Sequence, residues 1–150
     1  MHLLLNKKAS FNYEFLDKLE AGIELLGFEV KSLRKKQGSL EGAYAIVRGG
    51  ETFLVNVFIP PYQSKNTPKE YDPRRHRRIL LTKKEIAELT GAESKKGLTI
   101  VPISVYTKGR KIKVEIAVAR GKKKYDKREK IKRREAEREM RRTLKSYYAD

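Results

Sequence analysis

The chain has 150 residues, which is enough for one domain that buries roughly 70% of the surface of its unfolded form. Its 36 Lys and Arg residues outnumber its 19 Asp and Glu residues, and the net charge of +17 indicates a polyanionic partner, because no fold requires such an excess. It contains no cysteine, which excludes disulfides, zinc ribbons, iron–sulfur clusters and thiol nucleophiles, and no apolar run approaches the roughly 20 residues that span a bilayer.

The first long element, residues 13–26, fits two patterns. Apolar residues recur at every second position, with Asp17 as the exception, which is typical of a strand. Phe15, Leu19 and Ile23 also lie on one face of a helix, and intrinsic propensity slightly favours that helix. The residues alone therefore leave both interpretations open.

A short helix and a hairpin are predicted next. Residues 28–36 form the candidate helix. Residues 44–48 and 52–59 are predicted strands of a hairpin, and they are joined by Gly49 and Gly50, which suit a tight turn with positive φ.

A capped helix and a second hairpin complete the predicted domain. Thr82 and Glu85 have the spacing of a capping box, so they predict a helix that ends at Gly91. Residues 98–106 and 111–118 are predicted strands on either side of the turn Thr107-Lys108-Gly109-Arg110. In the second strand an apolar side chain alternates with Lys, Glu or Ala, which predicts one buried face and one solvated face.

A basic tail follows the last predicted strand. Residues 120–150 contain 14 Lys or Arg and 6 Asp or Glu. We therefore divide the chain into a globular domain at residues 6–119 and a tail at residues 120–150. In the tail Ala136, Met140 and Leu144 form an apolar line that is too narrow for a membrane-bound helix. We expect a segment that is disordered when free and becomes helical on a polyanion, with no role at a membrane.

Signals of catalysis and metal binding are missing from the sequence. His2 and His76 have no carboxylate or second His at ligand spacing, and neither a P-loop nor a nucleophile elbow occurs. We therefore expect no enzymatic activity, no cofactor and no metal site. Residues 1–5 lack the apolar region of a signal peptide, which favours a cytoplasmic protein.

Two further basic clusters precede the tail. Asn6, Lys7 and Lys8 lie at the start of the predicted domain, and residues 72–78 (DPRRHRR) lie between a turn and the capped helix. Three basic stretches and a large total charge favour a nucleic acid whose phosphates they neutralise. Charge alone does not distinguish RNA from DNA.

Several blocks of the sequence resemble those of the small protein B family, SmpB, in order and spacing from Asn6 to the end. They are GFEVKSLR at 27–34, IPPY at 59–62, YDPRRHRRILL at 71–81, GLTIVP at 97–102 and ARGKKKYDKRE at 119–129. The departures are small: His76 stands where the family more often has Lys or another polar residue, and Ile116-Ala117-Val118 replaces a commoner Gly-Leu pattern.

The resemblance implies a mainly β fold with short helices (α+β), an oligonucleotide-binding-type (OB-type) β-barrel with a basic C-terminal tail that becomes helical when bound. That fold favours the strand for residues 13–26. The resemblance also implies a monomer that binds transfer-messenger RNA (tmRNA, ssrA RNA) and delivers it to stalled bacterial 70S ribosomes for trans-translation. Elongation factor Tu is an expected partner through the tmRNA complex.

Family positions then imply the RNA-binding residues. Glu20 is expected to accept hydrogen bonds from bases, which a Lys cannot do, and Leu80 to offer an apolar surface. The alternatives are an ordinary surface charge for Glu20 and core packing for Leu80. The basic positions are expected to neutralise phosphates. The full set is Asn6, Lys7, Lys8, Glu20, Arg75, Arg77, Arg78, Leu80, Lys122, Lys123 and Lys124.

The start of the tail resembles the family's segment for the ribosomal decoding centre. This implies that Tyr125 stacks on a ribosomal RNA base, that Asp126, Lys127 and Arg128 are needed for accommodation, and that the following helix senses an empty mRNA channel. Two other functions stay open: a general single-stranded nucleic-acid-binding OB-type protein, and a nuclease or RNA-modifying enzyme.

Overall fold

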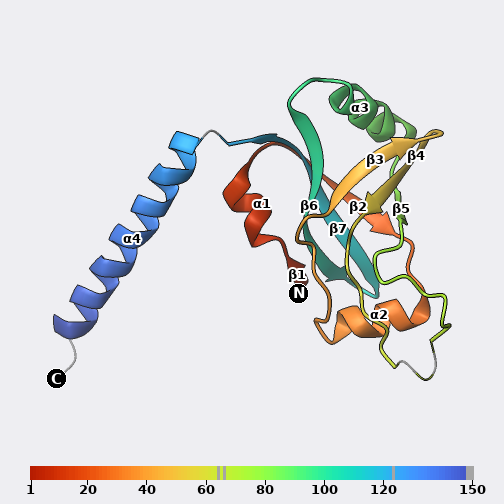
Figure 1. Ribbon diagram of the computed structural model, residues 1–150, viewed down its shortest axis with the longest axis horizontal. Helices are drawn as coiled ribbons and strands as arrows, with labels where there is room; N and C mark the ends of the chain where they lie inside the picture. Colours follow the sequence, from red (N-terminus) through yellow and green to blue (C-terminus); the bar gives the residue numbers. More distant parts are fainter. Residues whose placement is uncertain (64, 66, 123, 148–150) are drawn as a thin grey trace.

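The fold is a partly open ring of antiparallel strands. The computed structural model describes residues 1–63, 65, 67–122 and 124–147, and within 124–147 it describes the side chains of 131–143. Seven strands in this part of the chain form one sheet (Figure 1). They are β1 (His2–Leu5), β2 (Tyr13–Ile23), β3 (Tyr44–Arg48), β4 (Glu51–Val55), β5 (Arg77–Leu80), β6 (Leu98–Lys108) and β7 (Lys111–Gly121).

The strand order closes the sheet on itself. Strands follow one another as β6-β3-β4-β5-β2-β7, and β7 pairs again with β6. The pairing of β3 with β6 is limited to Ala45 opposite Ile100, so the ring is only partly closed there. The predicted OB-type, mainly β class is therefore confirmed.

Strand β2 settles the ambiguity of residues 13–26. It pairs with β7 from Tyr13 opposite Gly121 to Gly22 opposite Lys113, and with β5 at Gly22 and Ile23. Backbone pairing along both edges outweighs the slight helix propensity. The strand ends at Ile23, earlier than the predicted segment.

Both predicted hairpins are present, with different ends. Gly49 and Gly50 have φ values of 59° and 75°, which fit the tight turn between β3 and β4. Strand β4 ends at Val55 rather than 59, because Asn56 has a φ of 66° and turns the chain out of the sheet. Strand β6 extends to Lys108, beyond its predicted end, so Gly109 and Arg110 alone form the turn, whereas β7 begins at Lys111 as predicted and continues to Gly121.

Three short helices accompany the ring. They are α1 (Lys7–Asn12), α2 (Gly27–Arg34) and α3 (Lys83–Glu93). The capping box of α3 is confirmed, since the Glu85 amide donates to Thr82 Oγ1 at 3.2 Å and the Thr82 amide donates to Glu85 Oε1 at 2.9 Å. The predicted end at Gly91 is wrong: α3 continues to Glu93, with the Ser94 amide bonded to the Thr90 carbonyl.

The two ends of the chain differ in how they relate to the ring of strands. Strand β1 begins at His2 and pairs with β6, so residues before 6 belong to the same sheet, and Leu3 and Leu4 are buried. Helix α4 (Lys124–Tyr147) projects from the body on the side of α1 (Figure 1). The disorder of residues 120–150 in the free protein stays a prediction.

The core lies inside the ring. Leu54, Val114 and Ile116 point inward without exposed surface, and Leu33 closes the ring from α2. On the other face of β7, Lys113 and Glu115 keep exposed surface as the alternation predicted, but the prediction is wrong for Ala117, which is 1% exposed. In the described part of the chain, no helix is long and apolar enough to cross a membrane.

Candidate nucleic-acid interface

One row of paired residues crosses five strands on the outside of the ring. Directly opposed residues of antiparallel strands place their side chains on the same face of a sheet. The register makes this row continuous from β1 through β6, β7 and β2 to β5. We call it the outer row, and it consists of His2, Tyr106, Lys113, Gly22 and Leu80.

Glu20 faces the same side, because it lies two residues before Gly22 on β2. The Tyr106 hydroxyl donates to Glu20 Oε2, and Lys108 Nζ lies 3.0 Å from Oε1. These two hydrogen bonds, Tyr106 first, hold the pKa of the Glu20 carboxyl below its usual range. Glu20 is therefore an ionised, exposed carboxylate that only accepts hydrogen bonds.

A groove of about 330 Å³ lies at the Leu80 end of the outer row. A Cβ at Gly22 would lie 3.4 Å from the Leu80 Cβ, so the glycine leaves room beside this side chain, which is 47% exposed. Core packing is therefore not the role of Leu80. The residues that line the groove are apolar or cationic, without a carboxylate: Gly22, Ile23, Leu25, Val30, Arg34, Leu80, Arg110, Lys111, Ile112 and Lys113.

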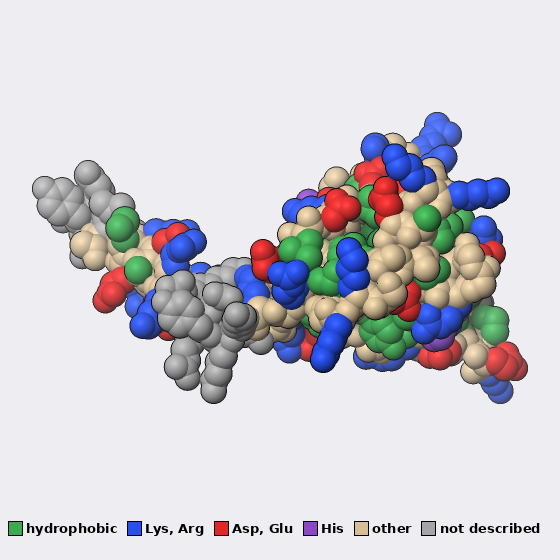
Figure 2. All heavy atoms as spheres, turned by 90° about the horizontal axis from the view of Figure 1, so that it is seen from above, with side chains coloured by type: hydrophobic (Ala, Val, Ile, Leu, Met, Phe, Trp, Pro, Cys, Tyr) green, Lys and Arg blue, Asp and Glu red, His purple; other side chains and the backbone are tan. Residues whose placement is uncertain are grey.

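This combination suits a folded RNA with exposed bases. An apolar floor accepts the face of a base or ribose, a carboxylate reads base N–H groups, and the surrounding cations neutralise phosphates. Figure 2 shows that Lys and Arg side chains are spread over one face of the body among exposed hydrophobic atoms, rather than gathered in a single block. The structure thus brings Glu20 and Leu80 to one face.

Asn6 lies apart from that face and has a structural role. It is 7% exposed, its amide nitrogen donates to the Leu40 and Pro102 carbonyls at 3.2 and 2.9 Å, and its Oδ1 caps α1 by accepting from the Ala9 amide. This burial is inconsistent with the predicted direct contact of its side chain with RNA. The cap instead presents the exposed Lys7 and Lys8, of which Lys8 pairs with Glu41 at 2.6 Å.

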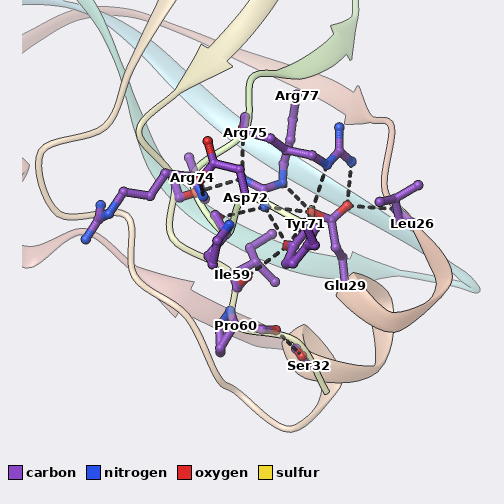
Figure 3. A network of polar contacts seen from close by, with 12 residues as sticks. Leu26, Glu29, Ser32, Ile59, Pro60, Tyr71, Asp72, Arg74, Arg75 and Arg77 are labelled. Carbon is purple, nitrogen blue, oxygen red and sulfur yellow. Dashed lines mark hydrogen bonds and ion pairs between the residues drawn. The ribbon is translucent and has the colours of Figure 1, made fainter. Parts of the chain in front are cut away.

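The arginine cluster of residues 72–78 is divided between a buried and an exposed role (Figure 3). Glu29 on α2 has no exposed side-chain surface and binds both Arg75 and Arg77. The Tyr71 hydroxyl lies 2.8 Å from Glu29 Oε2 and from the Ile59 carbonyl oxygen, which ties the preceding loop to the same carboxylate.

Arg77 is completely buried. It approaches Glu29 Oε2 with Nε at 2.8 Å and Nη2 at 2.6 Å, and it donates to the Val57 and Pro73 carbonyls at 2.7 and 2.9 Å. The predicted contact of Arg77 with phosphate is therefore wrong. A strand pattern could have revealed this, because Arg77 shares its face of β5 with the core residue Ile79.

The neighbours of Arg77 keep different amounts of exposed surface. The side chain of Arg75 is 29% exposed and is engaged by Glu29, whereas that of Arg78 is 43% exposed and lies 3.2 Å from Glu24. Arg78 is thus the predicted arginine that is most accessible to phosphate.

The buried cluster also shifts two ionisation equilibria. Burial raises the pKa of Glu29, but the hydrogen bonds from Arg75 and the Leu26 amide and the charge of Arg77 outweigh it, so the pKa lies below its usual value. Burial, together with the Glu29 carboxylate, raises the pKa of Tyr71 to about 12. Glu29 therefore stays ionised and Tyr71 neutral around neutral pH.

The sequence did not single out several residues of this face, among them Tyr106, Lys108, Arg34, Arg110 and Lys113. Period-two counting along residues 111–118 places Lys113 on the solvated side, but it does not pair Lys113 with Glu20. The irregularity between Pro102 and Ser104 shifts the alternation of β6, so counting along residues 98–106 does not place Tyr106. In the described part of the chain, no group of three or more His, Asp or Glu could hold a metal ion.

Comparison with known proteins identifies the family. The model of the SmpB protein family matches residues 3–146. The chain belongs to the SmpB family. It is 49% identical to the SsrA-binding protein of Gloeothece citriformis over 142 residues, 95% of this chain and 92% of the relative, and 49% identical to that of Chlorobaculum tepidum over 143 residues, 95% and 90%.

A solved structure of the same family has a similar fold. It is described as "tmRNA-SmpB: a journey to the center of the bacterial ribosome" and is 43% identical to this chain. The TM-score is 0.68, over 80% of this chain and 84% of the solved chain.

The SmpB family match also covers α4, so the tail is a family feature and not an accidental extension. Lys122, at the start of the tail, has its Nζ 3.1 Å from the Ser10 carbonyl oxygen. Lys123 lies outside the described residues. Helix α4 begins at Lys124 and includes Tyr125, Asp126, Lys127 and Arg128, whose side chains, like that of Lys124, are also outside the described part.

Proposed function

We propose that this protein binds tmRNA, the SsrA RNA, and delivers it to bacterial ribosomes that have stalled, for trans-translation. The observation that carries the proposal is the SmpB family match over residues 3–146, which spans both the ring and the tail. The related SsrA-binding proteins cover almost the whole chain. Both parts of the chain therefore have a place in the function.

The ring binds the folded, tRNA-like part of the RNA. Glu20 accepts hydrogen bonds from base N–H groups, and Leu80 packs against a base or ribose in the groove. Cationic side chains hold the phosphates, which makes the affinity dependent on salt. These cations are Lys7, Lys8, Arg78, Lys122, Lys123 and Lys124, together with Arg34, Arg110, Lys111 and Lys113 of the groove.

The tail distinguishes ribosomes with an empty mRNA channel from those that hold a message. Its 24-residue helix is about 36 Å long at 1.5 Å per residue. Tyr125 stacks on a base of the small-subunit rRNA, Asp126, Lys127 and Arg128 support accommodation, and the rest of α4 enters the mRNA channel. A resident message and this helix compete for the same space, so discrimination between stalled and active ribosomes is steric.

No step of this function requires chemistry by the protein itself. It acts in the cytoplasm as a monomer that supplies shape and charge, and elongation factor Tu joins through the tmRNA complex. The ribosome and the RNA carry out the reactions.

The proposal is tested by the RNA that the protein selects. We expect RNA sequencing after pull-down from a bacterial extract to recover tmRNA far above its abundance. In gel shifts at moderate salt, tmRNA should outcompete a tRNA and an oligo-U of matched charge. Equal affinity for all three would instead indicate a general single-stranded nucleic-acid-binding protein.

A further inference from the structure

The carboxylate of Glu20 is held in place from a neighbouring strand. Tyr106 on β6 donates its hydroxyl proton to Oε2, and Lys108, two residues further along the same face, binds Oε1 at 3.0 Å. Strand β7 separates these residues from Glu20, so both side chains reach across one strand to meet it. Such contacts fix a side chain that would otherwise sample several rotamers.

The partner residue Tyr106 is itself fixed. Its ring meets the His2 ring edge-on, with centroids 6.2 Å apart and planes at 73°, and the two residues are opposite each other in the β1–β6 register. His2 on β1 therefore supports the aromatic ring of Tyr106, this side chain places the hydroxyl, and the hydroxyl orients the Glu20 carboxylate.

Strand β7 places charges of both signs near Glu20, because Lys113 lies on the same face and its charge also lowers the pKa of Glu20. Glu115 on β7 lies directly opposite Glu20, and two carboxylates in such a pair repel each other. A free Glu20 would turn away from Glu115. The hydrogen bonds from Tyr106 and Lys108 keep it on the outer face in its ionised form.

We propose that Tyr106 is a positioning residue for RNA recognition, acting through Glu20, and that the group read there is a base N–H donor. This inference rests on the proposed function. An ionised carboxylate has about four lone-pair positions. Tyr106 and Lys108 each use one, and the remaining positions accept from an RNA base. A phosphate, which has no donor, is excluded from this point by the negative charge.

A double-mutant cycle tests the inference with tmRNA as the probe. We expect Tyr106→Phe, which keeps the ring and its contact with His2, to bind tmRNA about tenfold more weakly, because a hydrogen bond to an ionised group is lost. Its affinity for a tRNA of similar charge should change less than twofold. Tyr62→Phe removes a hydroxyl from an exposed tyrosine away from Glu20 and is the matched control; it should bind as the unaltered protein does.

The decisive measurement is Tyr106→Phe in a Glu20→Ala background. If Tyr106 acts through Glu20, the second substitution should cost less than twofold there, because the carboxylate that it positions is gone. A structural or independent role of Tyr106 would give the same loss in both backgrounds and would overturn the inference. Wild-type binding of tmRNA by the Glu20→Ala protein would overturn it as well.

Failure of the inference is distinguishable from failure of the proposed function. If the unaltered protein does not prefer tmRNA over tRNA, the proposed function is wrong, whatever the variants do. If that preference is present and Tyr106→Phe leaves it intact, only the positioning role is wrong.

Discussion

Replacing each of two adjacent arginines by methionine should affect a different property: stability for Arg77 and tmRNA binding for Arg78. In Arg77→Met the buried Glu29 loses both hydrogen bonds from this guanidinium and keeps one cationic partner, Arg75. The Val57 and Pro73 carbonyls lose their side-chain donor. Removing one partner of a buried ion pair costs about 3–5 kcal/mol. At roughly 2–4 °C per kcal/mol, the Tm should fall by about 10 °C.

Arg78→Met is the matched control, because the substitution is the same and the residue is next in the chain. Its pairs with Glu24 and Glu51 are exposed, and such pairs contribute about 0–1 kcal/mol. Stability should therefore change little. If Arg78 contacts a phosphate, the slope of log affinity for tmRNA against log salt should decrease by about 1.

The assays are urea unfolding followed by circular dichroism and tmRNA binding at several salt concentrations. Arg77→Met should lose stability but, under conditions where it remains folded, keep the salt slope. The reasoning would be refuted if both variants lost the same free energy of unfolding, or if Arg77→Met alone reduced the salt slope.

Three further changes test other parts of the account. The pKa of folded Glu29 lies below the usual 4.5, so its charge stabilises the fold above that pH, and this contribution is lost as the pH falls through the lower value. Glu29→Gln should therefore lower the free energy of unfolding more at pH 7 than at pH 3, and an equal loss at both would contradict this. Glu20→Lys should weaken tmRNA binding in gel shifts despite its added positive charge, whereas a gain would make Glu20 an ordinary surface charge. Truncation after Lys124 should leave tmRNA affinity within a few fold yet abolish tagging on stalled ribosomes, and a large loss of affinity would show that the tail is needed for binding.

Local patterns predicted the elements whose signals are local. The Gly49–Gly50 turn and the Thr82 capping box depend on neighbouring residues, and both are present. The alternation of residues 111–118 is confirmed for its inward side chains but is wrong for Ala117, which is buried on the other face. Strand β2 is different, because its residues fit a helix as well. Pairing with β5 and β7, which follow much later in the sequence, determines its form, and no local pattern contains that information.

Candidate site residues could be predicted from residue identity, but the side of the strand to which each side chain points could not. Family resemblance predicted Glu20 and Leu80 as RNA contacts, and the structure exposes both on one face. It treated Arg77 and Arg78 alike, although they point to opposite sides of β5. The contact of Tyr106 with Glu20 joins residues that are 86 positions apart, so only the closed ring reveals it.

The distinction between buried and exposed cations also explains how a protein with a net charge of +17 can keep its contact with tmRNA separate from its contact with the ribosome. Part of the charge is used internally, since Arg75 and Arg77 neutralise Glu29 and hold α2 against β5. Among the described side chains of α4, Arg134 contacts the body: it lies 5.9 Å from the centre of the Phe11 ring, and an exposed contact of this kind contributes about 0.5–1 kcal/mol. A channel walled by RNA phosphates offers a helix this basic considerably more. On the proposed function, we therefore expect the tail to leave the body when the mRNA channel is vacant, while the ring stays bound to the RNA.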